Sequence, residues 1–239
     1  MKPIVVRKIE RPEADLVRKL GEFGVAAVHE AQGRTGLMRP YMRPIFPGAR
    51  LAGPAVTVSC PAGDNLMLHA AIEQCRPGDV LVVAPLSVSE DGMVGELIGT
   101  SCQARGIAGI VLEAGCRDVA DLTEMNYPVF SRAISAQGTL KESAGSVNVD
   151  VVCAGATVHP GDVIVGDLDG VVVVPRRTVA DVIRAAEERL AREKKKRERL
   201  RAGELTVEID GLRAKLKELG VEYVDHAPDR DAPVGSVKA

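Results

Sequence analysis

The stretch ELIGTSCQARGIAGIVLEAGCRDVADL, residues 96–122, decides the fold of this chain because its composition changes twice between helical and strand-like. Helical stretches over 96–106 and 119–125 flank the apolar, β-branched run 107–115. The same alternation continues in both directions, with expected strands at 55–60, 79–85 and 127–133 and an expected helix at 65–75. Strands that alternate with helices predict an α/β layer with partly parallel pairing.

From about residue 146 the pattern changes to short β-branched runs separated by Gly and Pro, with no helical stretch between them. This spacing is typical of an antiparallel or barrel-like β unit. The two patterns together predict an α/β fold: a layered α-β-β-α sandwich with a mixed sheet, a small β-barrel-like unit and a C-terminal helical extension.

The chain divides into three expected parts: a core over 1–175, a helical extension over 176–225 and a tail over 226–239. The core opens with an amphipathic helix around 13–22 and a Pro-, Gly- and Arg-rich loop over 33–54. The tail has the composition of a disordered or loosely held segment.

The extension begins with a long helical stretch, 178–202, whose second half has almost no apolar residues. A second helix over 208–220 follows it. A mostly polar helix gains little from folding alone, so it either protrudes or packs on a neighbouring subunit. We favour subunit packing, which predicts a homo-oligomer.

Composition restricts the classes of partner. The 239 residues carry a net charge of -2, only 3% aromatics and no Trp, which disfavours nucleic-acid and anionic-membrane binding. Residues 176–203 hold eleven Lys/Arg against five Asp/Glu, which we interpret as a solvated helix face, with RNA contact as the alternative. Five cysteines without C-x-x-C spacing, and no long apolar run, predict reduced thiols in a soluble cytoplasmic protein.

The candidate functional residues lie at the ends of predicted strands. Gly95 precedes a helix whose first residues, Glu96 to Ile98, offer free N–H groups to a carboxylate. Arg117 and Asp118 follow the strand 107–115, and adjacent side chains on an extended segment diverge, so we expect separate partners. We therefore expect Asp118 to bind Mg²⁺ or Mn²⁺ and Arg117 to bind a substrate oxygen. The alternative stays open: Asp118 as a helix N-cap and Arg117 in a core ion pair.

Three segments of the chain resemble a known enzyme family: residues 95–122, 64–83 and 159–175. These segments resemble the 4-hydroxy-4-methyl-2-oxoglutarate/4-carboxy-4-hydroxy-2-oxoadipate aldolases, divalent-metal pyruvate aldolases of aromatic-acid degradation. The same core is shared with the regulator of ribonuclease activity A group, which binds RNase E. REKKKRERLRAGE, residues 192–204, resembles the C-terminal extension of the aldolases.

The resemblance implies site residues. Asp118 is the implied metal ligand, Arg117 contacts the keto or enolate oxygen, and the amides of Gly95, Glu96, Leu97 and Ile98 cradle the pyruvyl carboxylate. Glu96 stands where Asp is common, so its longer side chain lies near the metal waters. Glu193 is our placement for an acidic residue supplied by a neighbouring subunit, in a trimer or a hexamer of trimers.

The expected function is therefore that of a metal-dependent, class II aldolase, a carbon–carbon lyase. It would cleave a 4-hydroxy-2-oxo acid of this family to pyruvate plus pyruvate or oxaloacetate, with oxaloacetate decarboxylation as a side activity and a metal-polarised water as base. All ten lysines lie in polar surroundings, which disfavours a Schiff-base route. The alternatives are a non-enzymatic regulator that binds a ribonuclease, and a related enzyme acting on another keto acid.

Other residues are candidates for selecting between substrates. Asn65, His69 and the segment 33–40 are candidate contacts for a second substrate carboxylate. His69 lies in the apolar run LMLHAAI, residues 66–72, and such a histidine is more typical of a helical core.

Overall fold

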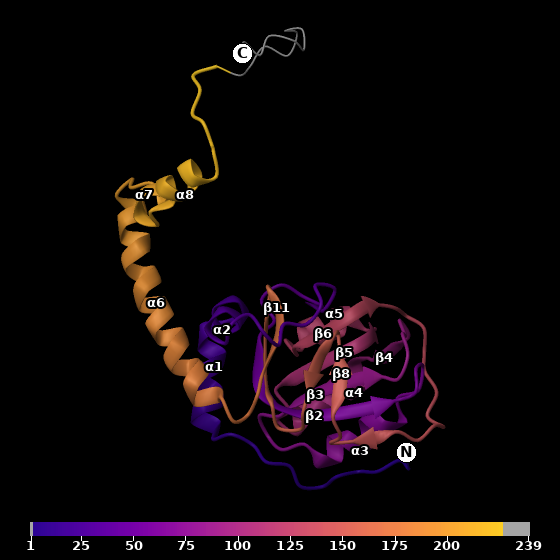
Figure 1. Cartoon of the computed structure of the whole chain (residues 1–239). Coiled ribbons are helices and arrows are strands. Elements are labelled where there is room, and N and C mark those ends of the chain that lie inside the picture. The colour runs from indigo at the N-terminus through magenta and orange to yellow at the C-terminus, as the bar shows by residue number, and fades with distance from the viewer. Residues whose placement is uncertain (1, 227–239) are drawn as a thin grey trace. The chain divides into compact units, whose positions relative to one another are not determined.

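The computed structural model describes residues 2–226 of the chain (Figure 1). Internal contacts group the chain into two compact units, Met1–Leu190 and Ala191–Ala239. The first unit holds all the strands of the described part, and within residues 191–226 the regular elements are all helices.

One half of the first unit is a parallel layer. Neighbouring strands pair in parallel in the order β6, β5, β3, β2, with β4 pairing in parallel with β5 alone. The strands are β2 (Leu51–Cys60), β3 (Val80–Pro85), β4 (Gly92–Val94), β5 (Gly109–Cys116) and β6 (Val129–Ile134). Three connecting helices cover the outer face of this layer: α3 (Leu66–Gln74), α4 (Glu96–Ala104) and α5 (Val119–Glu124).

The other half is antiparallel and nearly closes the sheet into a barrel. β10 (Val163–Asp167) pairs antiparallel with both β2 and β11 (Gly170–Val174). Leu37 bridges to Val172 of β11, and β1 (Arg43–Pro44) pairs with β6, so one loop joins the two edges of the sheet. The remaining short strands are β7 (Ser146–Val147), which pairs with β2, and the hairpin of β8 (Val151–Cys153) and β9 (Ala156–Val158).

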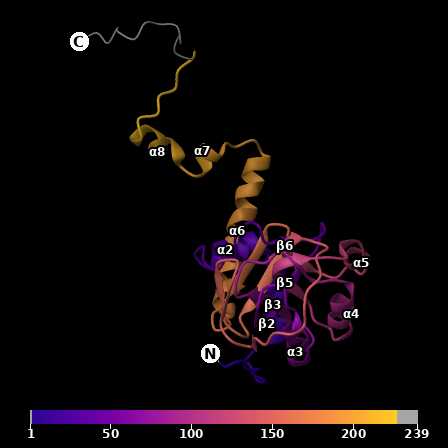
Figure 2. The ribbon, with the colours of Figure 1, turned by 90° about the vertical axis from the view of Figure 1, so that its right-hand side faces the viewer.

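Alternation along the strands places side chains in separate cores. In β3, Leu81 and Val83 face the helices α3–α5, whereas Val80 and Val82 face the barrel interior. In β10, Ile164 faces the interior and its neighbours face a third core, which is formed with α1 (Ala14–Phe23), α2 (Val25–Ala31) and the start of α6 (Val179–Arg201). Figure 2 shows α4 and α5 on one side of the strands and α2 on the other. The predicted α/β fold with a mixed, barrel-like sheet is confirmed.

Some elements differ from the predictions. Neither α2 nor β4 was expected from the sequence, and the predicted single helix over 208–220 is wrong. It consists of α7 (Thr206–Ile209) and α8 (Leu212–Glu218), because Gly211 adopts a left-handed conformation with φ of 64° between them. The predicted boundaries at 175 and 225 stay predictions; of the predicted tail, only His226 lies within the described residues.

Two further predictions concern the state of the cysteines and the absence of a membrane-spanning helix. All five cysteines are free and buried, in agreement with the predicted reduced thiols. Within residues 2–226 no helix is both long enough and apolar enough to cross a bilayer.

Candidate active site

A small cavity of about 140 Å³ lies where β4 and β5 end and where α3 and α4 begin. This is the carboxyl edge of the parallel layer, where α/β folds commonly bind ligands. The lining residues are Asn65, His69, Gly92, Met93, Gly95, Leu97, Ile98, Arg117, Asp118 and Lys141. The structure therefore brings Arg117, Asp118 and the 95–98 backbone together, although they lie about 20 residues apart in the chain.

Arg117 and Asp118 interact with each other, contrary to the prediction of separate partners. Arg117 Nε lies 3.6 Å from Asp118 Oδ2. The reason is the backbone: Asp118 is not extended but left-handed, with φ of 52° and ψ of 41°. This conformation is uncommon outside Gly, Asn and Asp, and it is often found at functional sites.

The carboxylate of Asp118 caps a helix other than its own. Oδ2 accepts a hydrogen bond from the Glu96 N–H at 3.0 Å, at the start of α4. Asp118 also occupies the N-cap position of α5, but its side chain makes no capping hydrogen bond there. The alternative of Asp118 as a helix N-cap is therefore correct for its position in the chain but not for its side chain. The alternative of Arg117 in a core ion pair is wrong, because its side chain is 44% exposed.

Gly95 permits this close approach. A Cβ at position 95 would lie 2.2 Å from Asp118 Oδ2 and 3.0 Å from Arg117 Cγ. The backbone of Gly95 is extended, with φ of -144°, so the requirement for glycine comes from the neighbouring side chains and not from strain. Gly92 is restricted in the same way, because its Cβ would lie 2.4 Å from the Ser135 carbonyl oxygen.

The first turn of α4 contributes backbone donors. The Glu96 N–H is used by Asp118, while those of Leu97 and Ile98 are first-turn groups without an intrahelical acceptor. The Glu96 side chain turns along its own helix, where Oε1 accepts a hydrogen bond from Thr100 Oγ1 at 2.8 Å. The backbone of Glu96 thus belongs to the site, whereas its carboxylate does not line the cavity.

Asn65, which lines the cavity, carries a hydrogen-bond acceptor that residues 2–226 leave unsatisfied. Its Nδ2 donates to the Met93 carbonyl oxygen at 3.0 Å, which fixes the orientation of the amide. Its Oδ1 is buried and has no hydrogen-bond partner among the described residues. A buried, unsatisfied oxygen costs free energy unless a ligand, ion or water supplies a partner.

Asp64 fastens the loop that carries Lys141. Its carboxylate accepts hydrogen bonds from the N–H groups of Leu66 at 2.9 Å and of Glu142 and Ser143 at 2.8 Å each. Burial alone would raise the pKa of Asp64, but these N–H donors outweigh it and hold the pKa below its usual range. The loop is thereby tied to the start of α3, and Lys141 reaches the cavity.

His69 is exposed, so its reading as a core histidine is wrong. On α3, Leu68, Ala71 and Ile72 take the buried face, and His69 lies on a different face beside the cavity. Partial burial, and then the charge of Lys141, lower the pKa of His69 and favour its neutral form. Sequence reasoning missed Lys141 because it lies in an irregular loop whose partner, Asp64, is distant in the chain.

The oxygen donors at this cavity fit a hydrated divalent cation. The described residues contain no cluster of three or more His, Cys, Asp or Glu side chains that could enclose a metal. Asp118 uses Oδ2 for the Glu96 N–H, and its Oδ1 makes no hydrogen bond or ion pair in that part of the chain. Mg²⁺ is commonly held by one or two carboxylates while it keeps several waters, so Asp118 with the Asn65 amide oxygen is a suitable set.

Glu193 lies on α6 in the second unit, and it lines none of the described cavities. Its placement near the metal of a neighbouring subunit stays a prediction. The segment 33–40 is likewise absent from the lining of this cavity.

Comparison with known proteins places these residues in a family. Residues 24–173 match the family model described as "RraA-like: Aldolase/RraA". A protein of Halalkalibacterium halodurans named "Putative 4-hydroxy-4-methyl-2-oxoglutarate aldolase" is 28% identical over 183 residues, covering 77% of this chain and 87% of its own. A Burkholderia multivorans protein of the same name is 36% identical over 143 residues, covering 60% and 87%.

A solved structure agrees with the family model. Streptomyces coelicolor RraAS2, described as an unusual member of the RNase ES inhibitor RraA protein family, matches with a TM-score of 0.70 and 28% identity. The match covers 80% of this chain and 99% of that one. The family model alone spans more than half of the 239 residues, including both Arg117 and Asp118. The chain therefore belongs to the RraA-like family of aldolases and RraA proteins.

Proposed function

We propose that this protein is a divalent-metal-dependent pyruvate aldolase for 4-hydroxy-2-oxo dicarboxylic acids. The substrates of this class are 4-hydroxy-4-methyl-2-oxoglutarate and 4-carboxy-4-hydroxy-2-oxoadipate, and the products are pyruvate plus pyruvate or oxaloacetate. The observation that carries the proposal is the convergence of Arg117, Asp118 and the first turn of α4 on one cavity. The names of the curated relatives support the same reaction.

The pyruvyl end of the substrate would bind at the start of α4. Its carboxylate accepts hydrogen bonds from the N–H groups of Leu97 and Ile98, where the helix dipole also favours an anion. Arg117 donates to the C2 keto oxygen and stabilises the negative charge that develops there during cleavage. Asp118, with Asn65, would hold Mg²⁺ or Mn²⁺, which supplies Lewis-acid polarisation of that oxygen when it is bound.

The far end of the substrate would bind beside Lys141. Lys141 is the second cationic side chain of the cavity lining, and it forms no ion pair within residues 2–226. Since the α4 amides take the pyruvyl carboxylate and Arg117 takes the keto oxygen, Lys141 is the cationic group left for a second carboxylate. We therefore assign the distal carboxylate of the dicarboxylic acid to Lys141.

Carbon–carbon cleavage also requires a base for the C4 hydroxyl proton. In place of the metal-polarised water expected from the sequence, we assign this task to His69. A neutral histidine is suited to it near pH 7, and His69 lines the cavity with a lowered pKa. In the proposed reaction a ring nitrogen of His69 takes the hydroxyl proton, the C3–C4 bond breaks, and its electron pair forms the pyruvate enolate. Oxaloacetate decarboxylation yields the same enolate without removal of a hydroxyl proton.

The proposal is tested by a coupled lactate dehydrogenase assay of pyruvate release. Substrates are 4-hydroxy-4-methyl-2-oxoglutarate and oxaloacetate, each with EDTA and with added Mg²⁺ or Mn²⁺. Turnover that EDTA removes and the metal restores supports a metal-dependent aldolase. Turnover that is indifferent to EDTA contradicts metal dependence, and no turnover of either substrate contradicts the proposed reaction.

A regulator of a ribonuclease is the second candidate. It is favoured by the likeness to RraAS2, whose description names it within a family of RNase ES inhibitors. That function needs neither Arg117 nor a metal. Binding to a ribonuclease, together with no pyruvate release in the assay above, would support this second function.

A further inference from the structure

A second and larger cavity, of about 660 Å³, opens at the other edge of the parallel layer. Its lining includes the start of β2 and the turn 76–79 directly before β3, whereas the candidate active site lies where β4 and β5 end. These strands belong to one parallel set, so the two cavities lie at opposite edges of the layer. The volume is that of a small-molecule site. We call it the arginine pocket because Arg11, Arg18, Arg50 and Arg76 line it.

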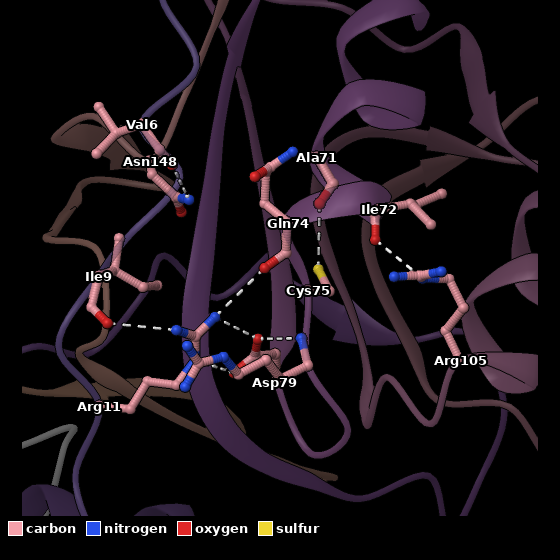
Figure 3. Close-up of polar contacts among 11 residues, drawn as sticks. Val6, Ile9, Arg11, Ala71, Ile72, Gln74, Cys75, Asp79, Arg105 and Asn148 are labelled. Carbon is pink, nitrogen blue, oxygen red and sulfur yellow. Dashed lines mark hydrogen bonds and ion pairs between the residues drawn. The ribbon is translucent and has the colours of Figure 1, made fainter.

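One arginine of the pocket is fixed and electrically balanced. Figure 3 shows Arg11 facing Asp79, with Nε and Nη2 donating to the two carboxylate oxygens at 2.7 Å each. Arg11 also donates to the carbonyl oxygens of Ile9 at 3.3 Å and Gln74 at 3.5 Å. The two side chains are only 13% and 1% exposed. This ion pair forms a rigid, neutral part of the wall.

The other three arginines leave an excess of positive charge. Arg18 pairs with the exposed Asp15, and Arg50 Nη2 donates to the Gly21 carbonyl oxygen at 3.2 Å. The Arg76 guanidinium makes no hydrogen bond or ion pair within the described part of the chain, although its backbone N–H is bound to Asp79. Glu22 is the one lining carboxylate besides Asp79.

The rest of the wall is mostly apolar. It includes Val17 of α1, the turn residue Pro77, and Leu51, Ala52 and Pro54 at the start of β2. An apolar wall edged by guanidinium groups matches a molecule with an apolar body and an acidic group. Guanidinium groups bind carboxylates, sulfonates and phosphates through paired, charge-assisted hydrogen bonds.

We propose that the arginine pocket is a binding site for an amphipathic organic anion, separate from the candidate active site. The apolar body lies against Val17, Leu51 and Pro77, and the acidic group binds Arg50 and Arg76. This assignment does not depend on the proposed aldolase activity.

The test uses 8-anilinonaphthalene-1-sulfonate as the probe, titrated calorimetrically into the full-length protein. We expect one saturable site per chain. Arg76→Gln and Arg50→Gln should each weaken binding by about tenfold, because each removes a charge-assisted hydrogen bond. Arg184→Gln is the matched control, since Arg184 is an exposed arginine outside the pocket, paired with Asp181, and this variant should bind as the wild type does.

A second variant separates the pocket from other apolar surfaces that bind the probe. Ala14 is exposed and lines the pocket, so Ala14→Trp fills the cavity without entering the core. It should remove the saturable site and leave the circular dichroism spectrum unchanged. The proposal is overturned if the wild type shows no saturable site, including the case in which a second copy covers the pocket. Equal affinity in the wild type and the Arg50, Arg76 and Ala14 variants overturns it as well.

Discussion

Asp118 combines three structural properties. It has a left-handed backbone, it caps the first N–H of α4, and it keeps one carboxylate oxygen free beside Arg117. Gly95 makes this possible because no side chain separates the two segments. The candidate active site therefore depends on contacts between single atoms, and small substitutions should have large effects on activity.

Gly95→Ala tests this dependence. The added Cβ would lie 2.2 Å from Asp118 Oδ2, so either the carboxylate or the α4 start must move. Overpacking of this kind costs about 1–3 kcal/mol of stability. We expect a folded protein with pyruvate release reduced by about 100-fold, comparable to loss of one positioned donor. Activity close to wild type would show that the Asp118 to Glu96 hydrogen bond is dispensable.

His69→Gln separates the two proposed activities. Glutamine keeps a polar side chain but cannot act as a base near neutral pH. Cleavage of the 4-hydroxy substrate should fall by roughly 100-fold or more, whereas oxaloacetate decarboxylation, which needs no hydroxyl deprotonation, should be retained. In the wild type, cleavage should decline as the pH falls through the lowered pKa of His69, because the imidazolium cannot accept a proton. Equal loss of both activities would assign His69 a structural role.

At the scale of elements, hydrogen bonds join the start of α3 to the loop after β6. Asp64 binds the first turn of α3 and the loop over 142–143, and the Leu140 N–H donates to Gly63 O at 2.9 Å. This brings Asn65 and Lys141 to one cavity although they lie far apart in the chain. Asp64 is the side chain that ties this irregular loop to α3 through three hydrogen bonds.

Asp64→Asn tests the anchor through pH. The pKa of Asp64 is lowered in the folded state, so its carboxylate adds stability above the unfolded-state pKa of about 3.9, and that stability is lost as pH falls through the folded value. Urea unfolding should therefore show a wild-type advantage at pH 7 of about 1–3 kcal/mol. The advantage should shrink at pH 3. A pH-independent difference would contradict a charge-based anchor.

Local sequence patterns predicted the regular elements well but not the loops. The runs 79–85 and 107–115 predict β3 and β5 because apolar, β-branched strands in a parallel layer need no distant information. The interaction between Arg117 and Asp118 was not predictable, since it depends on the left-handed backbone at one residue. Lys141 was missed because its position is set by Asp64, which no periodicity reveals.

At the scale of the whole molecule, the part of the extension beyond Leu190 lacks a core of its own, although the start of α6 packs in the third core. None of the described residues 191–226 is buried, and several of its large apolar side chains are exposed. These are Leu200, Leu205, Leu212, Leu219, Val221, Tyr223 and Val224. Exposed apolar side chains in such number favour association, so we keep the prediction of a homo-oligomer in which the extension packs on another copy.

Deletion of residues 203–239 tests that prediction. The wild type should sediment as a trimer or hexamer, and the shortened chain should form a smaller assembly because the apolar side chains are removed. The circular dichroism of the core should persist, since residues 1–190 form a compact unit. A monomeric wild type, or an unchanged assembly after the deletion, would contradict the prediction.

The most direct measurement of the central claim is pyruvate release by Arg117→Ala at saturating Mg²⁺, with Arg184→Ala as the matched surface control. Loss of one positioned charge donor costs roughly 3–4 kcal/mol of transition-state stabilisation, so turnover should fall by about 10²- to 10³-fold while the protein stays folded. Arg184→Ala should retain wild-type turnover. Undiminished pyruvate release by Arg117→Ala would contradict the assignment of this cavity as the aldolase active site.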